Sequence, residues 1–226
     1  MIVAVHQPNF LPWLGYFYKM AHSDVFVLLD SVAFSKNSYT NRSRIKTPQG
    51  EQWLTVPVRH SSGQLISETA INDETDWRKK HLKTLEANYA KAPFFREVFD
   101  GLSAIYAAAA GDGLSGFNMR LIRFVAEYCG ITTRLVVGSS LNVTGQSTDL
   151  LVAILKALGG TTYLSGTGGS KYQSEEDYTR AGLVLRYSDF AHPTYPQLWG
   201  PFCAGLSIVD ALFNCGRGTA RFLAGS

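Results

Sequence analysis

Short apolar runs alternate with amphipathic stretches at the start of the chain. Residues 2–6 form an apolar run rich in β-branched side chains, which is typical of a strand buried on both faces. Over residues 12–22, Trp13 and Phe17 begin a stripe of apolar positions three and four residues apart, which predicts a helix. A second buried strand is predicted over residues 24–30. Strand, helix and strand in this order indicate a βαβ unit with a parallel pair and a right-handed crossover.

Residues 31–72 break this rhythm. Two strands, Tyr39–Lys46 and Gln52–Val58, are predicted on either side of a turn at residues 47–50. A further extended stretch near Leu65–Ile71 suggests a third strand. We interpret this region as an antiparallel β-hairpin insertion beside the main sheet.

The rest of the chain is helical at first and then alternates again. The predicted helices of a segment over residues 75–130 cover 76–90, 93–109 and 114–129. The later predicted strands and helices are 133–137, 149–158, 162–165, 183–187 and 207–214. Buried strands with helices between them predict one α/β domain over residues 1–226, with a Rossmann-like parallel sheet flanked by helices.

Composition narrows the class of protein. With 46% hydrophobic and 17% charged residues, the chain can bury a substantial core. The formal net charge of +3 is too small to predict non-specific binding to nucleic acid or to a membrane surface. No apolar run approaches the roughly 20 residues that cross a bilayer. An odd number of cysteines, without a disulfide-framework spacing, fits a reducing compartment, so we expect a cytoplasmic protein.

Two kinds of catalytic chemistry find no support in the sequence. The chain has no GxSxG motif, and none of its cysteines stands beside an evident basic partner. The five histidines are dispersed, with no HxxxH or HxH pair. We therefore predict neither a metal site nor a cofactor.

The segment from His6 to Tyr16 is the strongest candidate for a ligand site. In open parallel sheets, ligands bind beyond the carboxyl ends of the strands, where His6 and Gln7 are predicted to lie. The free N–H groups at the start of the next helix suit a phosphate or a carboxylate. Gly15 would let a ligand or a neighbouring backbone come close. A lone histidine is more often a core residue, but the company of Gln7, Asn9, Trp13 and Tyr16 near one strand end favours a function.

A glycine- and serine-rich segment follows the predicted strand at 162–165. Ser165, Gly166 and Lys171 belong to the sequence Ser-Gly-Thr-Gly-Gly-Ser-Lys, whose N–H groups, hydroxyls and ammonium suit a phosphate. The GxxxxGK[ST] spacing of a Walker A loop is absent. A flexible connecting loop is the alternative interpretation. A position on the same sheet edge as His6 favours binding.

Two further groups could complete a pocket. A loop stiffened by two prolines would hold His192, Tyr195 and Gln197 in fixed positions. Asn41 and Arg42 precede the second hairpin strand, and an arginine fork can grip a phosphate or a carboxylate. Strand arginines that face water are the commoner outcome.

The last predicted helix begins with a capping pattern. Ser207 is suited to be its N-cap, and Asp210, three residues later, completes a loose capping box. We interpret both residues as structural rather than catalytic. Asp210 could also hold His6 or His192 in place as a hydrogen-bond partner.

The opening segment is similar to that of nucleotidyltransferases that handle adenylates. In those enzymes a first strand leads into a Phe-x-Pro stretch and a His-x-Gly-His turn. Here Phe10-Leu11-Pro12 is followed by Trp13-Leu14-Gly15-Tyr16, so the glycine is kept and both histidines are replaced by aromatic residues. The resemblance implies a related sheet and phosphate pocket, and the replacements argue against the same adenylyl transfer.

As a whole, the chain resembles the WbqC-like family of bacterial proteins. The matching motifs are His6-Gln7-Pro8 through Lys19, Asp30, Asn41-Arg42 with Arg44-Ile45, Trp53 to Val58, Tyr163 to Gly166 with Tyr172, Tyr195 with Gln197, and Ser207 to Asn214 with Gly216. The chain departs from the family pattern at Ser38-Tyr39, where a tryptophan-bearing stretch is expected, and at Cys203-Ala204, where a proline is usual.

The resemblance implies a biosynthetic context, because members of this family tend to occur among genes for O-antigen, capsule or specialised-metabolite assembly. We therefore expect a transferase in polysaccharide or specialised-metabolite biosynthesis. Its substrate would carry phosphate, as a nucleotide sugar or an activated acyl or aminoacyl donor does. One alternative is a non-catalytic nucleotide- or sugar-binding protein that assists a partner enzyme. Another, binding to the acceptor end of an RNA, is disfavoured by the small net charge.

The expected roles follow from the chemistry of the side chains. The catalytic candidates are His6, Tyr16 and His192. The substrate-binding candidates are Gln7, Asn9, Trp13, Asn41, Arg42, Ser165, Gly166, Lys171, Tyr195 and Gln197. Among these, His6 would act as general base or phosphate contact, and Arg42 and Lys171 would neutralise phosphate.

Overall fold

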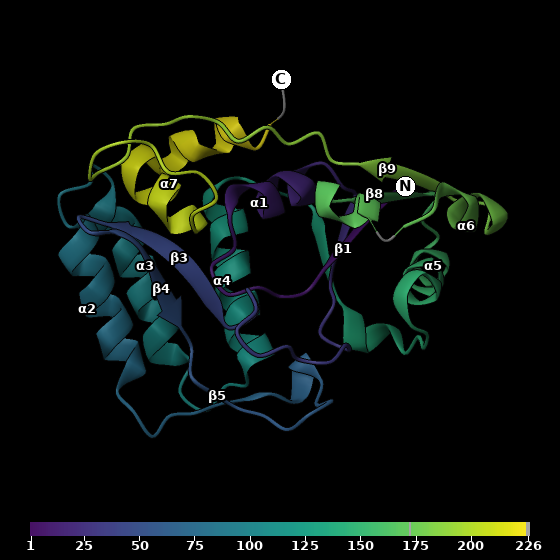
Figure 1. Cartoon of the computed structure of the whole chain (residues 1–226), viewed down its shortest axis with the longest axis horizontal. Coiled ribbons are helices and arrows are strands. Elements are labelled where there is room, and N and C mark those ends of the chain that lie inside the picture. Colours follow the sequence, from purple (N-terminus) through teal and green to yellow (C-terminus); the bar gives the residue numbers. More distant parts are fainter. Residues whose placement is uncertain (172, 225–226) are drawn as a thin grey trace.

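A parallel five-stranded sheet forms one part of the molecule (Figure 1). The computed structural model describes residues 1–171 and 173–224, without the side chains of residues 170 and 171. The strands of the sheet are β1 (Ile2–His6), β2 (Val25–Leu28), β7 (Arg134–Val137), β8 (Thr162–Ser165) and β9 (Val184–Tyr187). Their order is β7-β2-β1-β8-β9, and every neighbouring pair is parallel. The predicted Rossmann-like α/β fold is confirmed.

Alternate side chains of the central strands enter two separate hydrophobic clusters. Val3 and Val5 pack on one face with helix α5 (Ser147–Leu158). Ala4, between them, packs on the other face with helix α1 (Leu14–Ala21). Successive residues of a strand point to opposite faces. The uninterrupted apolar character of β1 therefore reflects burial on both sides, as expected for a parallel strand.

The order of the strands creates a switch point beside β1. The chain runs from β1 to β2 and then to β7 on one side, and it crosses to β8 and β9 on the other side. The segments that leave the carboxyl ends of β1 and β8 therefore depart from neighbouring strands in different directions. A crevice at such a switch point is where ligands of open α/β sheets bind.

The hairpin insertion forms a second, separate sheet. Strand β3 (Arg42–Thr47) pairs antiparallel with β4 (Gly50–Thr55), as the sequence predicts. The third strand expected near Leu65–Ile71 was largely wrong. Most of that stretch is a 3-10 turn and a loop, and only the two-residue β6 (Ala70–Ile71) pairs, with β5 (Val58–Arg59).

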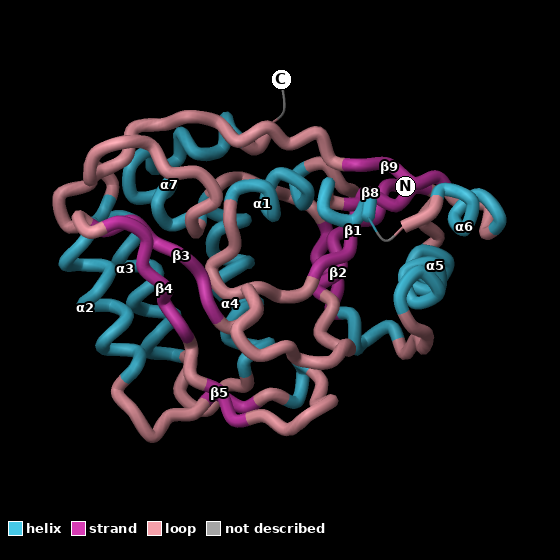
Figure 2. The backbone as a smooth tube through the Cα atoms, in the orientation of Figure 1, coloured by secondary structure: helices cyan, strands magenta, loops and turns pink. Residues whose placement is uncertain are grey.

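Helices surround the hairpin (Figure 2). They are α2 (Trp77–Tyr89), α3 (Phe95–Ala108), α4 (Leu114–Tyr128) and α7 (Ile208–Cys215). The predicted helices in this region are confirmed with ends that shift by one or two residues. Helix α1 begins at Leu14 instead of residue 12, and the short helix α6 (Glu175–Arg180) was not anticipated. Among the described residues, no helix is both long and apolar enough to cross a membrane.

Ser207 caps α7, but the predicted capping box is absent. The Ser207 hydroxyl accepts from the N–H of Val209 and donates to the carbonyl of Leu11. Asp210 does not reach back to Ser207, because its carboxylate accepts from the Tyr89 hydroxyl at 2.8 Å. Asp210 is therefore a buried tie between α7 and α2, and not the expected partner of a histidine.

His81 ties α2 to the hairpin. Its Nε2 lies 3.1 Å from the carbonyl oxygen of Thr55, and its Nδ1 lies 3.3 Å from the hydroxyl of Tyr106. These contacts fit a neutral ring that donates from Nε2 and accepts at Nδ1. Burial lowers the pKa of His81 from 6.5 to about 4, against the opposing effect of the Thr55 carbonyl.

We predict that His81 makes stability depend on pH in the acid range. Below pH 6.5 the unfolded chain binds a proton on this imidazole, whereas the folded chain resists until about pH 4. Stability that is present above pH 6.5 is therefore lost as the pH falls toward 4. Urea unfolding at pH 7 and pH 4.5 should show a loss about 2 kcal/mol larger in the native protein than in His81→Gln. Equal losses in the two proteins would contradict this assignment.

Candidate functional site

His6, Gln7 and Tyr16 meet at the carboxyl end of β1. The rings of His6 and Tyr16 lie 4.7 Å apart, and the Tyr16 hydroxyl donates to the carbonyl of Gln7 at 3.2 Å. The Gln7 side chain accepts from the Thr40 hydroxyl at 3.1 Å. Tyr16 is fully buried, whereas His6 and Gln7 keep part of their surface accessible. The imidazole therefore lies at the switch point, and the buried ring of Tyr16 packs against it.

His6 is neutral across the physiological range of pH. Burial and, to a smaller extent, the positive charge of Lys19 together lower its pKa from 6.5 to about 3, against the opposing effect of the Gln7 carbonyl. Its Nδ1 lies 3.3 Å from that carbonyl oxygen, which favours a proton on Nδ1 and leaves Nε2 as an acceptor. A neutral ring of this kind can accept a proton or a hydrogen bond from a substrate.

Lys19 occupies the place where β1 and β8 stop pairing. The last paired residues of these strands are Ala4 and Leu164. The His6 carbonyl accepts from Leu29, just beyond β2, so the Val5 carbonyl points to the opposite side, toward β8. Among the described residues, no backbone N–H of β8 or of the segment that follows it donates to the Val5 carbonyl. The Lys19 ammonium does so instead, with its Nζ at 3.0 Å from the Val5 carbonyl oxygen.

Lys19 was not among the residues that sequence reasoning selected. Its side chain is only 4% exposed, and no carboxylate among the described residues forms an ion pair with it. Burial lowers the pKa of Lys19 from 10.5 to about 7. One feature of the sequence could have pointed to Lys19. It is the charged residue of a helix whose other buried positions are apolar or aromatic. The cost of burying an unpaired cation is a reason to expect a function.

Segments from the hairpin and from α4 hold the loop after β1. The Asn118 side-chain amide donates to the carbonyls of Pro8 and Thr40, each at 2.7 Å. The neighbouring Asn41 is buried, and its amide donates to the Val56 carbonyl at 3.1 Å. Asn9 lies buried within the same loop. The predicted residues Asn9 and Asn41 thus lie in the support of this loop, beside Gln7 and its partner Thr40.

The serine- and glycine-rich segment begins at the edge of the sheet that also carries His6. Ser165 ends β8, and the chain then folds into a 3-10 turn over Thr167–Lys171. A Cβ atom on Gly169 would lie 2.3 Å from the Ser165 hydroxyl oxygen, so the absence of a side chain at Gly169 lets the Ser165 hydroxyl keep its position. The structure therefore brings Ser165 and Gly166 to the switch point. The side chain of Lys171, and the whole of Tyr172, lie outside the described residues.

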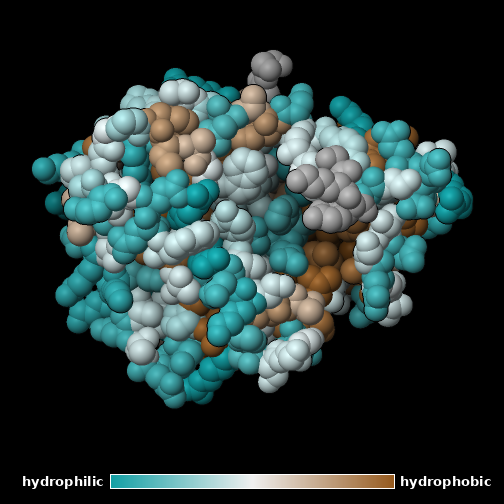
Figure 3. Space-filling model, viewed as in Figure 1, coloured by the Kyte–Doolittle hydropathy of each residue, from teal (hydrophilic) through white to brown (hydrophobic). Residues whose placement is uncertain are grey.

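Arg42 lies on the hairpin with an aromatic partner. Its guanidinium carbon lies 4.2 Å from the centre of the Trp53 ring, and the described residues offer it no carboxylate partner. Figure 3, viewed as in Figure 1, shows a depression between the part of the molecule that carries the hairpin and the part that carries the parallel sheet.

His192, Tyr195 and Gln197 form a different group, near the start of α1. Both nitrogens of His192 have partners, because Nδ1 lies 3.0 Å from the Pro193 carbonyl and Nε2 accepts from the N–H of Gly205. The Gln197 side chain accepts from the Lys46 ammonium and exchanges two hydrogen bonds with the backbone of Cys203. Tyr195 is buried beside Asp210. Among the described residues, no hydrogen bond or ring contact joins this group to His6.

Trp13 changes what Gly15 was expected to do. The glycine was expected to let a ligand or a neighbouring backbone come close. The indole of Trp13 fills that space instead, since a Cβ on Gly15 would lie 2.4 Å from it. The same indole lies 5.3 Å from the ring of Phe190 and 6.4 Å from that of His192.

The described part of the chain offers no ready metal site. Within it, no three His, Cys, Asp or Glu side chains are grouped closely enough to hold an ion. The chemistry available at the switch point is a neutral imidazole, a buried amine, a buried phenol, an amide and a serine hydroxyl.

Fold and geometry together define a class: a Rossmann-like α/β protein with polar and titratable side chains at the switch point of its sheet. The chain belongs to the WbqC-like protein family, which matches residues 7–222. It is 38% identical over 224 residues to the uncharacterised protein Rv1507c of Mycobacterium tuberculosis (strain ATCC 25618 / H37Rv), covering 98% of this chain and 96% of that protein. No solved structure gives a significant match to the chain.

We predict that Gly15→Ala will displace the Trp13 indole and lower the stability of the protein. The added methyl group would overlap the ring, and the ring would have to leave its contacts with Phe190 and His192. A drop in unfolding temperature, with a changed near-ultraviolet circular dichroism spectrum, is the expected result.

Gly116→Ala is the matched control. Gly116 also lies in a helix, and no described residue beyond its own turn of backbone lies within 4 Å of a Cβ atom added there. Alanine there should stabilise the protein by about 0.5–1 kcal/mol, because the unfolded chain loses backbone freedom. Equal effects at the two glycines would show that the indole does not constrain position 15.

Proposed function

We propose that this protein is a transferase of polysaccharide or specialised-metabolite biosynthesis that acts on a phosphate-bearing small substrate. The substrate would bind at the switch point between β1 and β8. Nucleotide sugars and activated acyl or aminoacyl donors are the substrate classes that fit this proposal. Membership of the WbqC-like family supports the biosynthetic context.

The observation that carries the proposal is the buried ammonium of Lys19 at the gap between β1 and β8. One of its three N–H donors binds the Val5 carbonyl, and among the described residues no carboxylate neutralises its charge. An anionic group that enters the crevice would supply the missing counter-charge. Charge-assisted hydrogen bonds of this kind are stronger than neutral ones.

His6 supplies the second element of the proposed chemistry. Burial and the nearby charge of Lys19 give the ring a pKa of about 3, which keeps it neutral. The negative charge of a bound phosphate would raise the pKa of this imidazole toward the operating pH, where it can take a proton from an attacking hydroxyl or amine. We assign Gln7, Asn41 and Ser165 to substrate positioning, and Arg42 to the phosphate from the hairpin side.

The other predicted site residues would have supporting roles in this proposal. Tyr16 would support His6 from behind. His192, Tyr195 and Gln197 would shape the wall that begins at Trp13.

A thermal-shift screen with nucleotide sugars, acyl-CoAs, ATP and aminoacyl donors is the first test of this function. A ligand at a concentration of 100 Kd stabilises the folded state by about 2.7 kcal/mol, which such a screen detects. Lys19→Met should keep the fold and bind the ligand roughly 10- to 100-fold more weakly, since one charge-assisted hydrogen bond is lost.

Lys46→Met serves as the control for Lys19→Met. Lys46 is equally buried, but its ammonium is held by Gln197, Gly200 and Pro201, away from the switch point. Its loss should lower the unfolding temperature. Because its partner Gln197 has only a supporting role in the proposed site, any loss of ligand affinity should stay well below that of Lys19→Met. A ligand that binds Lys19→Met as tightly as the native protein would refute the anion site.

His6→Asn tests catalysis separately from binding. With a ligand and an acceptor in hand, we expect turnover to fall roughly 10²- to 10⁴-fold with little change in affinity, because a general base contributes about that factor. His60→Asn, an exposed histidine elsewhere, should leave turnover unchanged. Undiminished turnover in a folded His6→Asn protein excludes His6 as the base.

The second candidate is a non-catalytic binding protein that assists a partner enzyme. The Trp13 indole lies against Gly15, where a ligand was expected to approach the first turn of α1. Because the indole occupies this space, a phosphate cannot approach the helix there as it does in the adenylate-handling enzymes. This arrangement favours a protein that binds a ligand without converting it. A ligand that stabilises the native protein through Lys19, yet is never converted with any acceptor offered, would support this candidate.

A further inference from the structure

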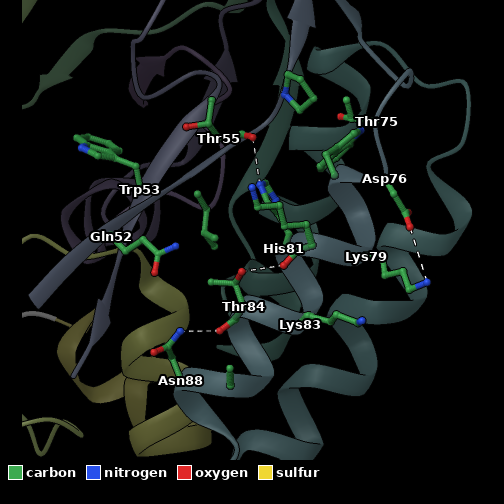
Figure 4. Close-up of a pocket in the computed structure, with 15 residues that line it drawn as sticks. Gln52, Trp53, Thr55, Thr75, Asp76, Lys79, His81, Lys83, Thr84 and Asn88 are labelled. Carbon is green, nitrogen blue, oxygen red and sulfur yellow. Dashed lines mark hydrogen bonds and ion pairs between the residues drawn. The ribbon is translucent and has the colours of Figure 1, made fainter. Parts of the chain in front are cut away.

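A large groove lies outside the set of residues assigned to the switch point. It is bounded by β4 on one side and α2 on the other, with a volume of about 1070 Å³ (Figure 4). Gln52 from β4 faces Thr84 and Asn88 from α2 across it. This volume lies at the upper limit of the roughly 300–1,000 Å³ that small-molecule sites occupy. None of the residues assigned to the proposed transferase site lines this groove.

One wall of the groove is an unpaired strand edge. Strand β4 pairs only with β3 among the described strands. On β3, the carbonyl of Arg44 accepts from Ser207 and the N–H of Lys46 donates to Tyr89, so these peptide groups point away from β4. Antiparallel register places Trp53 opposite Arg44. In an antiparallel pair, opposite residues share this orientation, so the peptide groups of Trp53 point away from β3.

Two neighbours confirm this orientation of the edge. Thr55, two residues after Trp53, presents its carbonyl to His81 of α2 at 3.1 Å. Glu51, two residues before Trp53, lies opposite Lys46. The outward N–H and C=O groups of Glu51 and Trp53 have no hydrogen-bond partner among the described residues. They form an open strand edge, the kind of surface that pairs with another extended chain.

The opposite rim carries positive charge. Lys79, Lys80 and Lys83 all line the groove, and Asp76 is the acidic residue among its described lining residues. The carboxylate of Glu51, on the strand edge itself, forms an ion pair with Arg44. Asp76 pairs with Lys79 at 3.8 Å, which leaves Lys80 and Lys83 without an ion-pair partner in the described part of the chain. An occupant with negative side chains would complement this rim.

We infer that the groove between β4 and α2 binds an extended acidic peptide segment of a partner protein by adding it as a strand to the free edge of β4. The segment's backbone would exchange hydrogen bonds with Trp53 and Glu51, and alternate carboxylates would reach Lys80 and Lys83. A single-stranded nucleic acid would satisfy the lysines. It lacks the alternating peptide donors and acceptors that the strand edge matches.

A synthetic peptide tests this inference on the whole protein. The probe is a capped peptide of about eight residues that alternates valine and glutamate. We expect it to bind at least roughly tenfold more tightly than a peptide that alternates valine and lysine. Hydrogen exchange should show new protection at the amides of Glu51 and Trp53. The amides of Gln52 and Leu54, which face β3, should be protected already in the free protein.

A pair of variants isolates the backbone contact. Trp53→Ala removes the side chain and keeps the N–H, whereas Trp53→Pro also removes the N–H. Proline is tolerated on an edge strand where the N–H faces outward, so the β3–β4 pairing should survive. We expect Trp53→Pro to bind the peptide at least roughly tenfold more weakly than Trp53→Ala.

Charge reversal tests the lysine rim. Lys80→Glu should weaken binding of the acidic peptide and improve binding of the lysine peptide. Lys156→Glu, at an exposed position on α5, is the control and should change neither.

Three results would overturn the inference. They are the absence of binding by the acidic peptide, binding without protection of Glu51 and Trp53, and equal affinities of Trp53→Pro and Trp53→Ala. A thymidine oligonucleotide that displaces the peptide and binds more tightly would assign the groove to nucleic acid instead. The two surfaces share none of the residues assigned to the switch-point site, although the Trp53 ring contacts Arg42. Lys80→Glu leaves that contact in place, so its effect on peptide binding is independent of the switch-point site.

Discussion

The hydrogen-bond ladder of β1 is the constraint on which the rest of this structure depends. Its peptide groups form hydrogen bonds with β2 on one side and with β8 on the other. Its side chains therefore point to the two faces of the sheet, and both faces are covered. Where β8 turns away, one carbonyl is left without a strand partner. Lys19 satisfies that carbonyl from α1, and the same contact brings a cation to the opening between the strands.

The electrostatics of the proposed site follow from that arrangement. The cation lowers the pKa of the adjacent imidazole, and burial lowers the pKa of the cation itself. At neutral pH the amine of Lys19, with a pKa of about 7, is therefore about half protonated, and the imidazole of His6, with a pKa of about 3, is neutral. A bound anion would reverse this balance by favouring the protonated amine. Ligand binding and proton uptake are thus linked at this position.

Much of the fold could be predicted because buried parallel strands leave continuous apolar runs in the sequence. The run at Ile2–His6 and the run at Thr162–Ser165 are confirmed at both ends. The role of Lys19 could not be predicted, since it depends on β8 lying beside β1, which no local pattern specifies. The sequence likewise could not show that His6 and His192 lie in different environments. The partners of His192 include the N–H of Gly205, thirteen residues away.

Asn118 has a mechanical consequence for the molecule. One amide group on α4 holds a carbonyl from the loop after β1 and a carbonyl from the segment that enters the hairpin. The hairpin and the sheet are therefore coupled at a buried point, close to where their walls face each other. Relative motion of the two parts would have to break this bridge or carry α4 with it. The space between them is thus preorganised, and a ligand would lose little free energy in ordering its walls.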